Sequence, residues 1–284
     1  MRVRSALLFS VLSLYLITAC SAAAGPAGAG VVGVIDSADG VPITYRVAGN
    51  GDTALVFVHC WSCDGRYWDA QMDHFAKNYR VVAVDLAGHG GSGFARAQYT
   101  VPAFAADVVA VIEQLNLKRV VLVGHSIGGP IIIEVASQAP ERIVGLIAVD
   151  SFETGAQWPK PEELSQFLAP FEENFRDKTS GFVRGLFKPS ADPALVTWIS
   201  HDMASAPPEV ALSALREGAL WTHRHKAERM ASLGVPLWNI NAEPQRNLPA
   251  KGNVVIIGDV GHFLPQVRPA EFNQALENIL AKLG

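Results

Sequence analysis

The stretch that decides the fold, residues 120–130, reads Val-Val-Leu-Val-Gly-His-Ser-Ile-Gly-Gly-Pro. Four consecutive β-favouring apolar residues lead into Gly124-His125-Ser126-Ile127-Gly128, and the apolar run 131–133 follows. This order predicts a buried strand, a tight turn with Ser126 at its apex, and a helix. Such a turn strains the backbone of its serine, and glycines two residues to either side avoid a clash with it. The competing interpretation is a glycine-rich turn with no chemical role.

Length and composition allow a large hydrophobic core. The chain has 284 residues, of which 49% are hydrophobic, and this suits one domain with a long insertion as well as two domains. Its formal net charge of -4 argues against nucleic acid as a partner. His223 and His225 have no acidic or cysteine neighbour at ligand spacing, so the sequence predicts no metal site.

Residues 1–19 have the pattern of an export signal. Arg2 and Arg4 precede an apolar run over 6–17 that is too short for an ordinary membrane span. The end of this segment, Ile17-Thr18-Ala19-Cys20, resembles the lipobox of bacterial lipoproteins, in which the cysteine becomes the lipidated first residue. The alternative is a plain secretory signal cut near residues 22–24. We expect an exported protein of the cell envelope, lipid-anchored or periplasmic, with residues 20–30 as a flexible tether and membrane contact through Cys20.

Strand and helix patterns alternate along most of the remaining chain. Val31–Asp36 and Ile43–Ala48 flank Asp39-Gly40, which is a hairpin signal. Apolar residues at spacings of three and four between 101 and 115 predict an amphipathic helix. The alternation implies right-handed crossovers and a parallel sheet. Continuous apolar runs, each typical of a buried strand, lie at 54–59, 81–85, 120–124 and 143–149, and the core pattern resumes at 237–241 and 254–257.

The alternation stops between residues 152 and 231. This segment has no convincing strand pattern but several helical patches rich in aromatic residues, which predicts a helical cap over a core formed by 31–151 and 232–284. Most of these aromatics should pack the cap against the core. We expect a minority to face Ser126 and to favour an apolar acyl or aromatic group, the candidates being Phe152, Trp158, Phe182 and Trp221.

Three motifs together resemble the α/β-hydrolase family with a helical cap. They are Gly124-His125-Ser126-Ile127-Gly128-Gly129, the loop 85–92 (Asp-Leu-Ala-Gly-His-Gly-Gly-Ser), and Gly261-His262-Phe263. The resemblance extends over 31–284 and implies an α/β fold with a mostly parallel eight-stranded sheet and helices on both faces. It also implies Ser126 as nucleophile and His262 as general base, with no cofactor. A serine hydroxyl is a weak nucleophile alone, so it needs a base and an orienting acid to react.

The acid departs from the pattern of the family. The usual position, in the loop after the strand beyond the cap, holds Gln245, and a neutral amide cannot stabilise a charged imidazole. Asp150 ends the strand immediately before the cap, where some members of the fold carry their acid, and Glu243 lies close to the usual position. We favour Asp150, with Glu243 as the alternative.

The oxyanion hole needs two amide donors. The resemblance places one at Ile127, immediately after the nucleophile, and the other at Trp61, although Cys60 stands where the family usually has glycine. Cys60 and Cys63 form a C-x-x-C spacing, which in an oxidising compartment allows a bridge that would rigidify this loop. Free thiols and a redox motif are the alternatives.

The function predicted from these features is a serine hydrolase that cleaves an ester or related acyl bond of a small apolar substrate. Lactonase and carbon-carbon bond hydrolase activities would use the same residues, because the scaffold hosts all of them. A catalytically silent protein that binds a hydrophobic ligand under the cap is the alternative from another class. The oligomeric state stays open.

Overall fold

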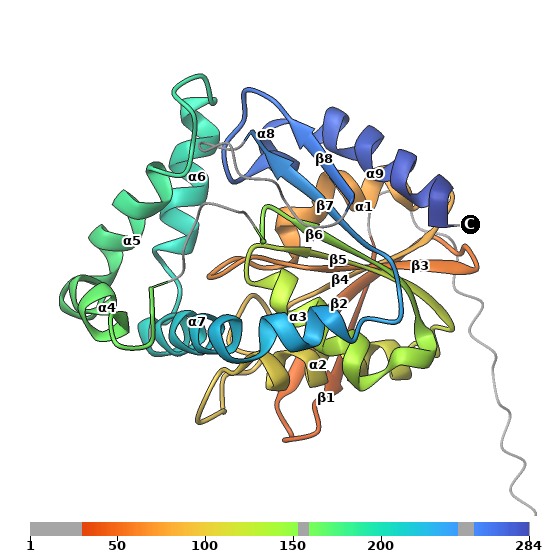
Figure 1. Ribbon diagram of the computed structural model, residues 1–284, viewed down its shortest axis with the longest axis horizontal. Helices are drawn as coiled ribbons and strands as arrows, with labels where there is room; N and C mark the ends of the chain where they lie inside the picture. Colours follow the sequence, from red (N-terminus) through yellow and green to blue (C-terminus); the bar gives the residue numbers. More distant parts are fainter. Residues whose placement is uncertain (1–29, 153–158, 244–252, 284) are drawn as a thin grey trace, which may run out of the picture.

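The computed structural model describes residues 30–152, 159–243 and 253–283. Its centre is one eight-stranded sheet in the order β1-β2-β4-β3-β5-β6-β7-β8, with helices on both faces (Figure 1). This arrangement confirms the predicted α/β fold. The strands are β1 (Val31–Asp36), β2 (Pro42–Ala48), β3 (Thr53–Val58), β4 (Arg80–Val84), β5 (Arg119–His125), β6 (Ile143–Val149), β7 (Leu237–Ala242) and β8 (Asn253–Ile257).

The sheet is antiparallel only at its first edge. β1 and β2 form the predicted hairpin, with Val34 opposite Thr44, and Gly40 has a positive φ of 81° in the turn between them. β2 also pairs antiparallel with β4, whereas β4, β3, β5, β6, β7 and β8 pair in parallel. The carboxyl ends of the parallel strands therefore meet along one edge, where ligands commonly bind in such sheets.

Two helical layers bury the faces of the sheet (Figure 1). One contains α1 (Asp69–Phe75), α8 (Leu264–Val267) and α9 (Pro269–Leu283), and the other contains α2 (Val101–Gln114) and α3 (Gly128–Gln138). In β3, Leu55 and Phe57 pack in the core beneath α1, α8 and α9, while Val56 and Val58 pack in the core beneath α2 and α3. Successive side chains of a strand point to opposite faces of the sheet. Because both faces of the sheet are covered, all side chains of such a strand are buried, and its sequence is a continuous apolar run. Full burial of one such side chain contributes about 1.5–3 kcal/mol to stability.

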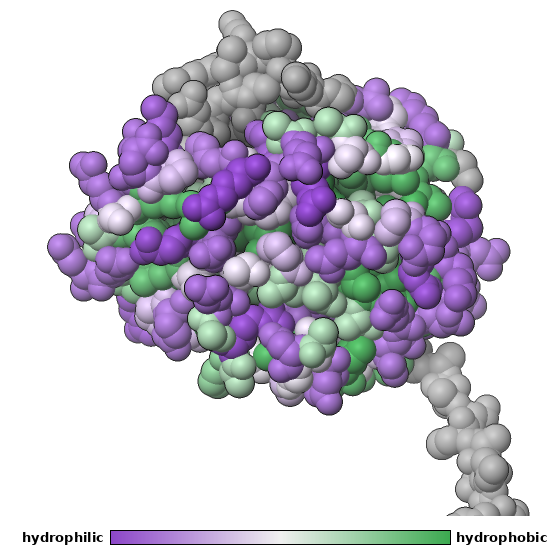
Figure 2. Space-filling model, turned by 60° about the horizontal axis from the view of Figure 1, so that its bottom comes forward, coloured by the Kyte–Doolittle hydropathy of each residue, from purple (hydrophilic) through white to green (hydrophobic). Residues whose placement is uncertain are grey.

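The described residues between β6 and β7 form four helices, which together with the loops that join them we call the cap. The helices are α4 (Leu164–Glu173), α5 (Phe175–Arg184), α6 (Pro193–Met203) and α7 (Pro208–Ala231). α4, α5 and α6 lie beside the sheet, and α7 runs back along α3 (Figure 1). Trp221 fixes α7 to α3 by donating from Nε1 to Glu134 Oε2 at 3.1 Å, and Arg229 pairs with the same carboxylate. Seen from the α7 side, the outer surface is mainly hydrophilic, with hydrophobic residues lying between and beneath (Figure 2).

Several predictions fall on residues that the structure does not describe. The export signal, almost all of the tether, Cys20, Trp158 and Gln245 lie outside the described residues. Within the described ranges, none of the helices combines the length and the apolar character that crossing a bilayer requires.

Candidate active site

The turn after β5 has the strained geometry predicted for it. Ser126 follows the strand directly with a φ of 55°, and its amide donates to Val149 O at 2.9 Å. A Cβ on Gly124 would overlap the carbonyl of Gly128, and a Cβ on Gly128 would lie 2.7 Å from Val58 O. The turn therefore tolerates side chains at neither glycine, and it places partly exposed Ser126 at the amino end of α3.

His262 and Asp150 form a pair at the same edge of the sheet. His262 Nδ1 lies 2.6 Å from Asp150 Oδ2, and the Asp150 side chain is only 4% exposed. The other carboxylate oxygen, Oδ1, accepts the Ala242 amide at 3.0 Å. Because the carboxylate is an acceptor, Nδ1 carries the proton of this hydrogen bond and Nε2 is left to act as a base. Glu243, the alternative acid, is exposed, and among the described residues it makes no hydrogen bond with His262.

The His262 loop is held from two sides. The His262 amide donates to Leu186 O of the cap at 3.0 Å, and its carbonyl accepts from His125 Nε2 at 2.9 Å. The rings of His125 and His262 lie 4.7 Å apart. These contacts place the predicted base against His125, the residue that directly precedes the predicted nucleophile.

Three other histidines support loops as neutral groups. His59 accepts the Leu86 amide at Nε2 and donates from Nδ1 to Cys60 O, a pattern that only the neutral ring can make. Burial lowers the pKa of His59 to about 4, and it lowers the pKa of His89 and of His125 to about 3. These three rings therefore stay uncharged at neutral pH.

Asp85 of the second sequence motif has a structural position. Its two carboxylate oxygens accept the amides of Gly65 and Gly91, each at 2.8 Å. Burial raises the pKa of Asp85. The motif thus joins the 85–92 loop to the segment that follows β3.

The loop after β3, residues 59–64, lies against the serine turn because Val58 pairs with Gly124. Trp61 is 5% exposed, and its indole Nε1 donates to Ala211 O of α7 at 2.7 Å. Within the described ranges, the backbone amides of Trp61 and Ile127 donate to no protein acceptor. They are therefore available to bind an anionic oxygen. Cys60 and Cys63 form a disulfide across this loop, with their Cα atoms 5.2 Å apart.

Cap aromatics gather around Trp61. Phe171, Phe175 and Phe182 each meet its ring edge-on, with centroids 6.2–6.3 Å away. Phe182 is nevertheless 39% exposed, so this cluster reaches the surface of the cap.

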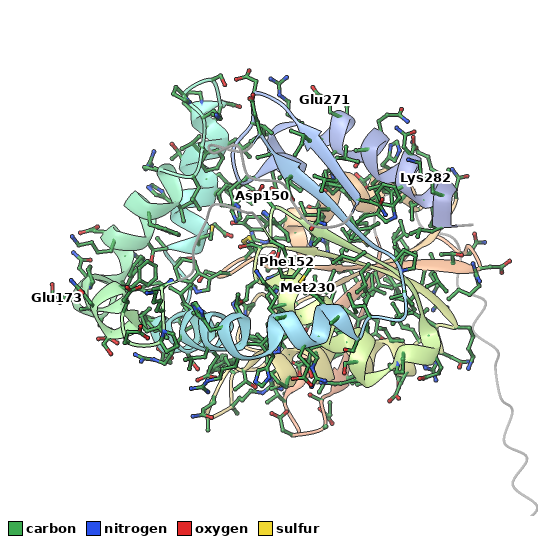
Figure 3. All side chains as sticks on the ribbon, in the orientation of Figure 1. Asp150, Phe152, Glu173, Met230, Glu271 and Lys282 are labelled. Atoms are coloured by element: carbon green, nitrogen blue, oxygen red, sulfur yellow. A yellow bond between two sulfur atoms is a disulfide. The ribbon has the colours of Figure 1, made fainter. Side chains whose placement is uncertain are left out.

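Phe152, one of the predicted pocket residues, lies against the serine turn. Its ring approaches Gly129, and Lys226 Nζ lies 5.8 Å from the ring centroid. Asp150 and Phe152 lie in the middle of the molecule, whereas Glu173 lies at the outer tip of the cap (Figure 3). Trp221 is buried against α3 rather than exposed to a cavity.

Sequence reasoning missed Ser151. Its Oγ donates to the Ser126 carbonyl at 2.5 Å and would overlap a Cβ on Gly129. The available signal was its place directly after Asp150, opposite a second glycine of the turn. Ser151 therefore supports the backbone of the predicted nucleophile.

Two other features lie apart from this site. An open groove of about 1240 Å³ lies where β3, β4 and β5 begin, around Arg46, Arg80 and Arg119, and includes none of the predicted site residues. The described part of the chain contains no group of three or more metal-ligating side chains.

The chain belongs to the Alpha/beta hydrolase family, whose model matches residues 55–275. A dihydrolipoyllysine-residue acetyltransferase component of an acetoin cleaving system from Pseudomonas putida is 28% identical over 84% of this chain. This chain spans 66% of that relative's length. Est816, described as an N-acyl homoserine lactone degrading enzyme, is 28% identical with a TM-score of 0.75, covering 87% of this chain and 99% of its own. A thermophilic esterase from Thermogutta terrifontis is 25% identical with a TM-score of 0.73, covering 89% and 99%.

Proposed function

We propose that this chain is a serine hydrolase that cleaves carboxylic esters, or related acyl bonds, of small apolar substrates. The observation that carries the proposal is the 2.6 Å pair of His262 and Asp150 beside a serine turn with φ of 55°. Membership of the hydrolase family and the likeness to an esterase at 25% identity support it further.

In the proposed mechanism, Ser126 Oγ attacks the carbonyl carbon while His262 Nε2 takes the hydroxyl proton. Asp150 holds the ring in the required tautomer and stabilises its positive charge. The amides of Ile127 and Trp61 bind the oxyanion of the tetrahedral intermediate. His262 then gives its proton to the leaving alcohol, and water releases the acyl group by the same steps in reverse.

The proposed preference for an apolar acyl group is supported by the surroundings of the serine turn. Phe152 packs on the turn, and the aromatic cluster of the cap surrounds Trp61 beside the proposed oxyanion hole. Such surfaces favour alkyl or aromatic groups over charged ones. A panel of p-nitrophenyl esters of rising chain length should show kcat/KM increasing from acetate to the medium chains.

A fluorophosphonate probe tests the nucleophile and also tests the alternative of a silent binding protein. The probe should label the wild-type protein, and labelling should vanish in the Ser126→Ala variant. A folded wild-type protein that takes up no label would favour the binding protein. Labelling that persists in Ser126→Ala would place the nucleophile elsewhere.

A lactonase is the second candidate, and the likeness to Est816 favours it. An N-acyl homoserine lactone presents an apolar acyl chain, and its ring ester has the carbonyl that Ser126 would attack. Comparing kcat/KM for such lactones with that for p-nitrophenyl esters of the same acyl chain decides between the two. A higher value for the lactone would make ring opening the main activity.

We also propose that the chain is exported and anchored to a membrane through a lipid on Cys20, as the signal-like residues 1–19 suggest. Detergent phase partitioning of protein expressed in a bacterial host tests this. The wild-type protein should enter the detergent phase and the Cys20→Ala variant the aqueous phase. Wild-type protein in the aqueous phase would contradict the anchor.

A further inference from the structure

The Cys60–Cys63 disulfide encloses one of the two proposed oxyanion donors. The bridge joins the ends of a four-residue segment whose second residue is Trp61. Inside it, the Cys63 amide donates to Cys60 O at 3.2 Å, and Ser62 has a φ of 54°. Cys63 Sγ lies 3.4 Å from the Trp61 carbonyl, a packing contact because a disulfide sulfur has no proton to donate.

The flanks of this segment are held without the bridge. His59 is fixed on one side between Cys60 O and the Leu86 amide. On the other side, Asp64 accepts from the Arg66 amide and pairs with its guanidinium, which also reaches Asp202 of the cap. Loss of the bridge would therefore free the short segment at its centre and leave its two ends in place.

The Trp61 side chain is also held without the bridge. Its indole donates to Ala211 O and packs among three cap phenylalanines. Among the described residues, however, the Trp61 backbone amide has no acceptor that would fix its direction. Its direction instead follows Cys60 O, which lies in the same planar peptide and accepts from His59 Nδ1 and from the amide of Cys63, the residue that the bridge joins to Cys60. A change of about 1 Å at an oxyanion donor matters for rate.

We propose that the Cys60–Cys63 disulfide is a positioning device that aims the Trp61 amide at the oxyanion, so that catalysis depends on the oxidised bridge. This inference rests on the proposed function. A bridge over four residues restricts the unfolded chain less than a long one does, so its main effect is local rather than on global stability. Both cysteines are 2% exposed, so a reductant reaches the bridge only slowly in the folded protein.

The test compares the full-length oxidised protein with a Cys60→Ser/Cys63→Ser double variant. Alkylation and mass spectrometry first establish the bridge in the native protein, and two free thiols there would overturn the proposal. For p-nitrophenyl butyrate, we expect kcat to fall ten- to a hundredfold in the variant while KM changes less than twofold. Complete removal of one donor costs about 10²–10³-fold, which sets the upper limit.

A merely structural bridge would not change the affinity for transition-state analogues selectively. A trifluoromethyl ketone forms a tetrahedral oxyanion on the serine, whereas the corresponding alcohol binds without forming one. We expect the ketone's inhibition constant to rise by the same factor as kcat falls, with that of the alcohol unchanged. Equal changes for both inhibitors, or a kcat within twofold of wild type, would overturn the proposal.

Chemical reduction of the wild-type protein provides a second test if the double variant fails to fold. Prolonged treatment of the wild-type protein with a small phosphine reduces the bridge. The phosphine gives two electrons to the disulfide, and one water supplies the oxygen of the phosphine oxide and the protons of the two thiols. Activity should fall on reduction and return on reoxidation, with circular dichroism unchanged, and the same treatment should not affect the double variant. Fluorophosphonate labelling of the oxidised protein distinguishes a failure of the proposed function from a failure of the proposed role of the bridge. Its absence overturns the proposed function, whereas labelling with redox-insensitive kcat overturns only the role of the bridge.

Discussion

The proposed acid is best tested by replacing Asp150 with asparagine. Asp150 has a φ of 45°, a conformation that asparagine tolerates better than most residues, so the backbone should keep its path. Asparagine Oδ1 can still accept the Ala242 amide, as the aspartate does at 3.0 Å. Its NH₂ group then occupies the position from which Asp150 Oδ2 now faces His262 Nδ1 at 2.6 Å.

Two N–H donors cannot share that contact. His262 must therefore release the Nδ1 proton and carry it on Nε2, where the ring can no longer accept the proton of Ser126. An aspartate-to-asparagine change that enforces the wrong tautomer in this way lowers kcat by about 10⁴-fold. At 1.36 kcal/mol for each factor of ten, the transition state loses about 5.4 kcal/mol of stabilisation.

Steady-state hydrolysis of p-nitrophenyl butyrate at pH 7.5 measures this effect, and Glu243→Gln is the matched control. Glu243 is exposed, so its variant should keep kcat within about threefold of wild type. The reasoning is refuted if Asp150→Asn retains more than a tenth of the activity, or if Glu243→Gln loses more than Asp150→Asn does.

Three further predictions concern the support of the site. In Gly129→Ala, the new Cβ meets Ser151 Oγ and displaces its hydrogen bond to Ser126 O, so fluorophosphonate labelling should slow at least tenfold. The control Ser151→Ala should slow labelling less. Equal labelling rates in Gly129→Ala and wild type would contradict the clash. Trp61→Phe leaves the Ala211 carbonyl without its 2.7 Å donor, so urea unfolding should show a loss of about 1–3 kcal/mol, and an unchanged midpoint would disprove the anchoring role. Because the pKa values of His59, His89 and His125 are lowered in the folded protein, these rings become protonated below pH 6.5 in the unfolded chain but not in the folded one. The free energy of unfolding should therefore fall by about 2 kcal/mol per histidine from pH 7.5 to 5. Urea melts across that range test the sum, and a flat profile would show that these rings are not neutral in the fold.

The elements of the core could be predicted because each of them has a local pattern. The strands that cross the interior, such as Thr53–Val58 and Ile143–Val149, are continuous apolar runs since both faces are covered. The serine turn was visible from its glycines, whose close contacts leave no room for a side chain. Asp150 could be proposed from its place at a strand end, but only the structure shows its contact with His262.

Features that depend on contacts distant in sequence could not be predicted. Trp61 and Ala211 lie 150 positions apart, and no local pattern predicts the hydrogen bond between them. The same holds for Trp221, which carries the signature of a cap aromatic and yet binds Glu134 on α3. Helical spacing shows that a residue has an apolar neighbour but does not identify that neighbour.

The candidate site is built on two adjacent strand ends that have the same backbone geometry. His125 and Val149 are the last paired residues of β5 and β6, and Ser126 and Asp150 follow them with φ values of 55° and 45°. Each of these two amides donates to a neighbouring strand, from Ser126 to Val149 O and from Asp150 to Ile240 O. The proposed nucleophile and acid are thus fixed to one parallel pair of strands, and His262, the proposed base, contacts Asp150 from the segment after β8. An acid on β6 also explains why aspartate suits this position better than glutamate, because aspartate is among the few non-glycine residues that adopt a positive φ readily.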